Sequence, residues 1–168
     1  MPNWCDNTLY IRGPKAEIQR FLGGVKTKDS RFDLIPVLHF PRNLRGGEAG
    51  EQTDEWCLRN WGTKWPIYDE SLTILEIVKL RGDNEFEVVL EFGTASTPPI
   101  PVILEASRRF RELEFDLRYS DPATALGGIY RAKNGFDAHA DCGDLVVWDF
   151  NMSCIRYNQE ASRPARVG

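Results

Sequence analysis

The stretch Leu72–Phe92, LTILEIVKLRGDNEFEVVLEF, decides the fold. Residues 72–80 are rich in β-forming side chains, and residues 82–84, Gly-Asp-Asn, have the composition of a tight turn. Apolar residues then occupy every second position from Phe86 to Phe92, which is the period of a strand with one buried face. The stretch therefore predicts two consecutive strands, from which the rest of the chain can be read outward.

Helices and strands alternate on both sides of these two strands. Downstream, Pro98–Pro101 opens a helix whose apolar side ends at Phe110. Over residues 113–119 apolar and polar side chains alternate again, which predicts a strand. Upstream, apolar and polar side chains alternate over residues 8–12, which predicts a strand that ends at Gly13-Pro14. A helix follows, because its apolar residues recur at the spacing of one helix face: Ile18, Phe21, Leu22 and Val25.

The predicted order is β-α-insertion-β-β-α-β with further strands at 126–131 and 145–150. We therefore predict the α+β class, with a ferredoxin-like split β-α-β sheet whose helices lie on one face. A single domain covers 1–157. It includes an irregular, tryptophan-rich insertion at about 26–70 and a C-terminal β extension at about 120–157, and 158–168 is a flexible tail.

The insertion carries weak local signals. Residues 32–35 suit a short strand, and 42–55, with several glycines and scattered charges, read as a mobile loop. Asp54 is placed to cap a brief helix around Trp56. Residues 60–66 read as a turn rich in tryptophan.

Composition excludes several protein classes. The chain has 168 residues, 42% hydrophobic content and a net charge of −4, so it is globular and lacks the basic excess of a sequence-independent DNA binder. Its four cysteines are scattered, without a C-x-x-C pair, and the first residues do not resemble a signal peptide. No apolar run reaches the ~20 residues that a membrane span requires. We expect a cytoplasmic protein with reduced thiols and no membrane partner.

The open face of the predicted sheet is the first candidate surface. Alternation places on it four carboxylates and two arginines, which makes it mildly acidic. One interpretation is a surface that docks on a basic partner protein, and the other is a solvated sheet with cross-strand ion pairs. Tyr10 is the only aromatic residue there, too little for an RNA-binding sheet. The candidate binding residues are Glu87, Glu91, Glu114 and Asp116.

The tryptophan-rich insertion is the second candidate surface. Trp56, Trp61 and Trp65 are able to form an aromatic platform for a base, a sugar or a peptide, with Lys64 as a phosphate or cation–π contact. The alternative is that these rings anchor the core, since large aromatic side chains dominate core packing.

Metal and catalytic chemistry have little support in the sequence. His139, Asp141 and Cys142 lie close together, but the two close ligand pairs of a structural zinc site are missing. A cysteine paired in space with His39 or His139 stays open, without a local signature to support it. We predict no metal, no cofactor and no catalytic residue.

Three motifs resemble a known family. The opening Met1–Leu9, MPNWCDNTL, resembles the start of the YubB-type ferredoxin-like proteins of phages, prophages and plasmids. Asn60–Trp65, NWGTKW, and Phe92–Pro99, FGTASTPP, resemble the other two signatures, although a tryptophan is expected where this chain has Ser96. The resemblance covers about 1–130. It implies a mobile-element origin and the same fold, and the family has no established activity to carry over.

Three functions stay open on this basis. The first is a non-enzymatic protein-binding module of a phage or mobile element, which engages a host protein and inhibits a host defence in the manner of an anti-CRISPR protein. The second is a single-stranded nucleic-acid binder that uses the tryptophan-rich loop. The third is an enzyme of uncharacterised activity.

Overall fold

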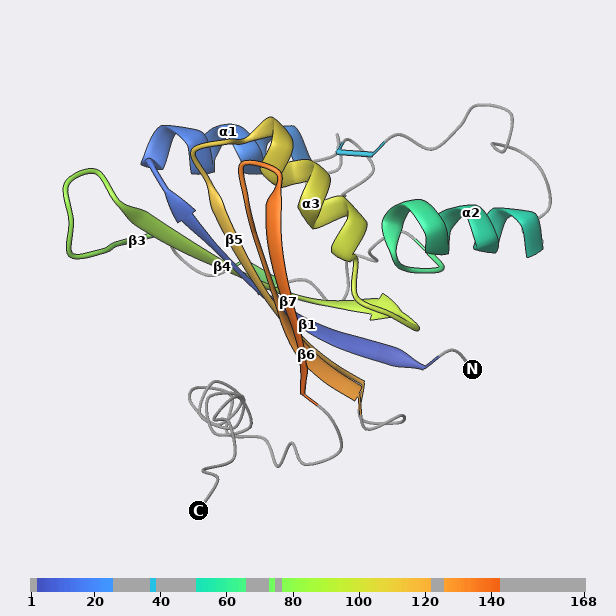
Figure 1. Ribbon diagram of the computed structural model, residues 1–168. Coiled ribbons are helices and arrows are strands. Elements are labelled where there is room, and N and C mark those ends of the chain that lie inside the picture. Colours follow the sequence, from blue (N-terminus) through green and yellow to red (C-terminus); the bar gives the residue numbers. More distant parts are fainter. Residues whose placement is uncertain are drawn as a thin grey trace, which may run out of the picture.

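The computed structural model describes residues 3–25, 37–38, 51–65, 73–74, 77–121 and 126–142 (Figure 1). Residues 51–52, 73–74, 126 and 139–142 are described by their backbone alone. Several predictions lie outside the described residues, namely the strands at 32–35 and 145–150, the tail at 158–168, His39 and Cys154.

One antiparallel sheet and three helices make up the described part of the chain. The strands are β1 (Trp4–Gly13), β2 (Thr73–Ile74), β3 (Val78–Lys79), β4 (Phe86–Ala95), β5 (Glu114–Asp121), β6 (Leu126–Lys133) and β7 (Phe136–Cys142). The helices are α1 (Lys15–Val25), α2 (Glu51–Trp61) and α3 (Ile100–Arg109). The strand order is β2-β4-β1-β5-β6-β7, with β3 also paired to β4. The predicted α+β class is confirmed.

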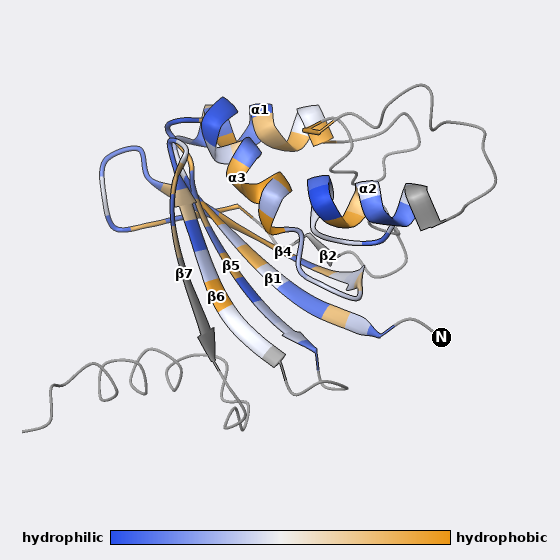
Figure 2. Ribbon diagram, turned by 45° about the vertical axis from the view of Figure 1, so that its right-hand side comes forward, coloured by the Kyte–Doolittle hydropathy of each residue, from blue (hydrophilic) through white to orange (hydrophobic). Residues whose placement is uncertain are grey.

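The core lies between the sheet and α1 and α3, which cover the same face (Figures 1 and 2). Alternate residues of the strands point to this face, so Leu9 and Leu117 are fully buried. Phe21 of α1 joins the layers, because its ring packs edge-on against Phe110 at 5.2 Å and against Phe115 of β5 at 5.4 Å. The residues that lie between these along each strand point to the opposite face of the sheet, as the alternation predicts.

Among the described residues of the strand predicted over 72–80, two short strands are present, β2 and β3. Ile74 pairs with Leu90 and Val78 pairs with Glu87. The chain therefore uses four steps from Ile74 to Val78 where β4 uses three, so one extra residue lies between these two pairings on this side of β4.

Helix α2 also differs from its prediction. It begins at Glu51, so 51–55 is helical where a loop was predicted, and Asp54 lies inside the helix and does not cap it. An ion pair between Glu55 and Arg59 at 2.9 Å has the spacing of one helical turn and supports this longer helix.

Strand β6 confirms the strand predicted at 126–131, and β7 is a further strand that was not predicted. Asn134 and Gly135 form the two-residue turn between them, with φ angles of 51° and 80°. The backbone N–H of Gly135 donates to Ser107 Oγ at 3.1 Å, which ties this turn to α3. Among the described helices, none has the length and apolar character needed to cross a membrane.

Candidate binding site

The described residues of the three motifs at 1–9, 60–65 and 92–99 meet at one end of the sheet. Trp4 of β1 pairs with Ala95 of β4, and the N–H of Ser96 donates to the carbonyl oxygen of Asn3 at 2.8 Å. The N–H of Lys64, which follows α2, donates to the carbonyl oxygen of Ala95 at 3.2 Å. We call this region, residues 3–7, 62–65 and 94–97, the motif junction.

Asn7 holds two of the motifs together from inside. Its side chain is buried, and Nδ2 lies 2.9 Å from the carbonyl oxygen of Cys5 and 2.9 Å from Thr94 Oγ1. It also lies 3.2 Å from the carbonyl oxygen of Phe92. A buried amide satisfied on two strands fixes their relative position, because leaving these groups unpaired away from water costs free energy.

The loop after α2 is fixed just as closely. Thr63 Oγ1 donates to the carbonyl oxygen of Ala95 at 3.0 Å, and Thr97 Oγ1 donates to the carbonyl oxygen of Gly62. Gly62 has a φ of +76°, and a Cβ at this position would lie 2.6 Å from Pro101 Cδ and 2.7 Å from the carbonyl oxygen of Pro98. Only glycine fits both the conformation and the space.

The tryptophans of the insertion separate into two groups. Trp56 and Trp61 pack edge-on with ring centroids 5.4 Å apart, and Trp61 is 4% exposed. Its Nε1 donates to the carbonyl oxygen of Leu38 at 2.8 Å. Because Trp61 is enclosed in the core, the prediction that it belongs to a surface platform is wrong, and the alternative that these rings anchor the core holds for it.

Trp65 contacts a different partner, at the surface of the motif junction. Its ring lies 6.5 Å from that of Trp4 at an interplanar angle of 66°, and Trp4 is 47% exposed. Lys64, next to Trp65, is partly exposed. Trp4 was not predicted as a binding residue, although extending the alternation of residues 8–12 back to residue 4 places this ring on the open face of the sheet.

The described thiols are poor nucleophiles. Burial raises the pKa of Cys5 to about 12, with the nearby carboxylates of Asp121 and Asp6 adding to the shift. Burial raises the pKa of Cys57 to about 11. Both thiols therefore stay protonated at neutral pH, whereas a nucleophilic cysteine needs a lowered pKa. Within the described side chains, no group of three His, Cys, Asp or Glu is placed to hold a metal ion, and the side chains of His139, Asp141 and Cys142 lie outside that description.

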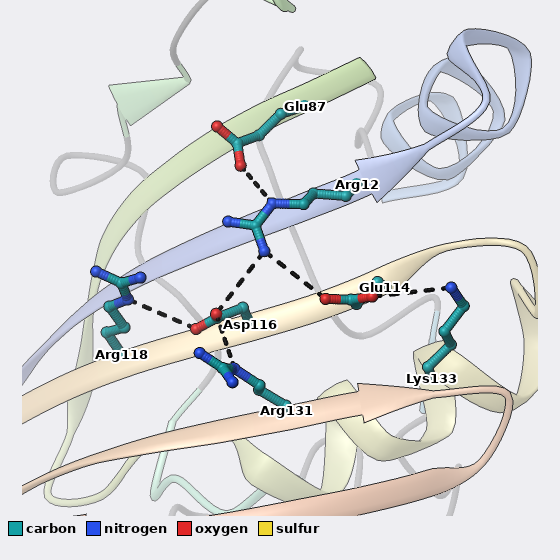
Figure 3. Close-up of polar contacts among 7 residues, drawn as sticks. All are labelled: Arg12, Glu87, Glu114, Asp116, Arg118, Arg131 and Lys133. Carbon is teal, nitrogen blue, oxygen red and sulfur yellow. Dashed lines mark hydrogen bonds and ion pairs between the residues drawn. The ribbon is translucent and has the colours of Figure 1, made fainter. Parts of the chain in front are cut away.

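The open face carries a network of ion pairs centred on Asp116 and Arg12 (Figure 3). Asp116 is 1% exposed and lies 3.0 Å from Nε of Arg131 and 3.6 Å from Nε of Arg118. Arg12 lies 2.6 Å from Glu87 through Nε, and its Nη1 is 3.7 Å from Glu114 and 3.9 Å from Asp116. Lys133 completes the network at 3.8 Å from Glu114.

Strand β6 changes the charge expected for this face. Arg131 and Lys133 lie beside β5, so the four predicted carboxylates share the face with four cations, and Asp6 lies at its edge. Three of the four predicted binding carboxylates thus have partners within the chain, which favours the interpretation of a solvated sheet with cross-strand pairs. The fourth, Glu91, is exposed, and no salt bridge joins it to another described residue.

Comparison with known proteins gives a likeness in fold. No family model matches the chain, and no curated protein matches it. A crystal structure of a protein api92 from Yersinia pseudotuberculosis, of the family DUF1281, superposes with a TM-score of 0.53. It is 11% identical to this chain, and the match covers 85% of this chain and 99% of that one. The likeness shows the fold alone.

The structure therefore joins some predicted residues and separates others. Lys64 and Trp65 come together with Trp4 at the motif junction, whereas Trp61 lies in the core with Trp56 packed against it. The predicted carboxylates lie on the open face of the sheet. The motif junction is the place where the exposed Trp4, its partner Trp65 and the three motifs coincide.

Proposed function

We propose that this chain is a non-enzymatic protein-binding module whose contact surface is the motif junction, with Trp4, Trp65 and Lys64 at its centre. The exposed Trp4 carries the proposal. Its backbone is paired with β4, and its ring rests on Trp65, so the indole meets a partner with little further loss of conformational freedom. Rigid, exposed aromatic side chains are the usual energetic centres of protein interfaces.

The partner is a protein with an apolar pocket for an indole and an acidic group opposite Lys64. The resemblance to the YubB-type family supports a phage, prophage or plasmid origin, and with it a host protein as the partner. A component of a host defence system, inhibited by surface complementarity in the manner of an anti-CRISPR protein, is the partner class that this context favours.

The strand order supports the ferredoxin-like assignment of the sheet. Taken as one interrupted strand, β2 and β3 are the second strand of a β-α-β-β-α-β unit, β4 is the third and β5 the fourth. The order is then second, third, first and fourth across the sheet, and β6 and β7 extend it beyond the fourth strand.

The test is capture of a partner by the immobilised chain. The chain should retain one host protein at a fixed stoichiometry, and Trp4→Ala should lose it. Leu58→Ala is the matched control, because Leu58 is also an exposed apolar residue, at 37%, but lies on α2. Equal capture by the wild type and Trp4→Ala, with both folded, would contradict the proposal.

A single-stranded nucleic-acid binder is the second candidate, favoured by the position of Lys64 beside the Trp4–Trp65 pair. Bases stack on exposed aromatic rings, and a lysine neutralises phosphate. This candidate predicts binding of an oligonucleotide that weakens steeply with added salt and is lost in a Trp4→Ala, Trp65→Ala variant. Absent or salt-independent binding would end it.

A further inference from the structure

One row of residues crosses the open face from edge to edge. The strand registers place Val78 beside Glu87, Glu87 beside Arg12, Arg12 beside Glu114, Glu114 beside Lys133, and Lys133 beside Phe136. The four inner residues alternate in charge, and the two outer ones are apolar. Val78 is 56% exposed and Phe136 is 78% exposed, the highest values among the exposed large hydrophobic residues described.

This row is complementary to its own reverse. Read from β3 to β7 it is apolar, negative, positive, negative, positive, apolar. Read from β7 to β3 it is apolar, positive, negative, positive, negative, apolar. A second copy placed face to face in the reversed direction therefore meets an opposite charge at every charged position and an apolar side chain at each end.

We propose that the open face binds a second copy of this chain, in a dimer whose two-fold axis runs parallel to the strands between β1 and β5. Glu87 then faces Lys133 of the other copy, Arg12 faces its Glu114, and Val78 faces its Phe136. A two-fold dimer uses the same patch on both copies, so each of these contacts is made twice.

The next row contributes less to the dimer, because the same axis places Val89 opposite Arg131 of the other copy. The inner residues of this row are Tyr10 on β1 and Asp116 on β5, which are register partners, but Asp116 is 1% exposed and already paired within its own chain. The alternative two-fold axis in the plane of the face, perpendicular to the strands at the first row, places every charge of that row opposite itself. Charge therefore selects one of the two face-to-face arrangements.

The size of the face sets the expected strength. Five strand spacings of about 4.8 Å by three row spacings of about 6.8 Å give on the order of 500 Å² per copy. Two copies then bury on the order of 1,000 Å², which is at the lower end for specific interfaces. We expect association in the micromolar range that weakens as salt is added, because partly exposed charges are screened.

Charge exchange tests the arrangement. In Lys133→Glu the outer contact becomes a pair of facing carboxylates, and in Glu87→Lys it becomes a pair of facing ammonium groups, so each variant alone should be monomeric. In an equimolar mixture of the two variants, both outer contacts of a heterodimer join a carboxylate to an ammonium group, so the mixture should dimerise although neither variant does alone. The double variant Glu87→Lys, Lys133→Glu should also dimerise, because each of its outer contacts again joins an ammonium group to a carboxylate.

The double variant should therefore dimerise although each single variant does not. Sedimentation of the wild type, the two single variants and the double variant, from about 1 to 300 μM around the expected dissociation constant, gives the readout. Recovery of the dimer by the second charge change is the result that the proposed pairing requires, because general electrostatic repulsion between copies would not produce it.

The controls separate this effect from general charge and from folding. Arg59→Glu makes a charge change of the same size and sign as Lys133→Glu but lies on α2, so it should leave the wild-type dimer intact. Phe136→Ser should weaken the dimer without changing its salt dependence, and Trp4→Ala should not affect it. A wild type that stays monomeric across this range would overturn the proposal, as would a folded double variant that stays monomeric.

Discussion

Gly62→Ala should destabilise the chain strongly, because the alanine would be strained in two ways. A side chain at a φ of +76° costs about 1–2 kcal/mol. Its Cβ would also lie 2.6 Å from Pro101 Cδ and 2.7 Å from the carbonyl oxygen of Pro98, and forced overpacking costs about 1–3 kcal/mol. Together these effects predict a loss of roughly 3 kcal/mol in the free energy of unfolding.

The matched control is the same substitution at Gly23 of α1. No atom lies within 4 Å of a Cβ built there, so Gly23→Ala should stabilise the helix by about 0.5–1 kcal/mol. Thermal unfolding followed by circular dichroism should show Gly62→Ala melting roughly 6–12 °C below the wild type, and Gly23→Ala slightly above it. If both variants melt at the wild-type temperature, the described geometry of the loop at 62–65 is incorrect.

Three further outcomes follow from the buried polar groups. Asn7→Ala should lower the free energy of unfolding in urea by about 2–3 kcal/mol, because it leaves backbone acceptors and Thr94 unpaired; a loss within error of zero would contradict the bonding described. Cys5 should resist thiol reagents in the native state at pH 8 and react in urea. The pKa of the Cys5 thiol is raised from 9.0 to about 12 on folding. Its contribution to the free energy of unfolding is therefore complete below pH 9 and falls above it, by about 1.4 kcal/mol at pH 10. A Cys5→Ala variant should lack this alkaline loss. Asp116→Asn should destabilise by about 1–3 kcal/mol, more at low salt, because three arginines lose their shared charge partner; unchanged stability at every salt concentration would refute that role.

The parts of the fold that the sequence predicts well are those with one buried and one exposed face. Residues 8–12, 86–92 and 113–119 alternate because each strand carries helices on one side only, and the structure confirms all three. Strand β7, FDAHADC, was missed because it is a polar segment of low β-propensity. It is held by its ladder to β6 and by the turn at Asn134-Gly135.

The candidate sites were harder to predict, because they depend on pairing between distant segments. The surface role of Trp4 and the burial of Trp61 follow from contacts across the sheet, such as Asn7 with Thr94, 87 residues apart. The charge balance of the open face required the register of β6, which places Arg131 beside Asp116. Composition and local period carry no information on either pairing.

The Trp4–Trp65 contact also provides an optical reporter. Two indole rings held 6.5 Å apart at 66° couple their electronic transitions, which gives a circular-dichroism couplet that neither ring has alone. This couplet exists only when β1, β4 and the segment after α2 have all assembled, and such long-range pairing is slow compared with helix formation. In refolding experiments the part of the couplet that a Trp4→Ala variant lacks should therefore appear after the helical signal, and it would report assembly of this end of the sheet without an added label.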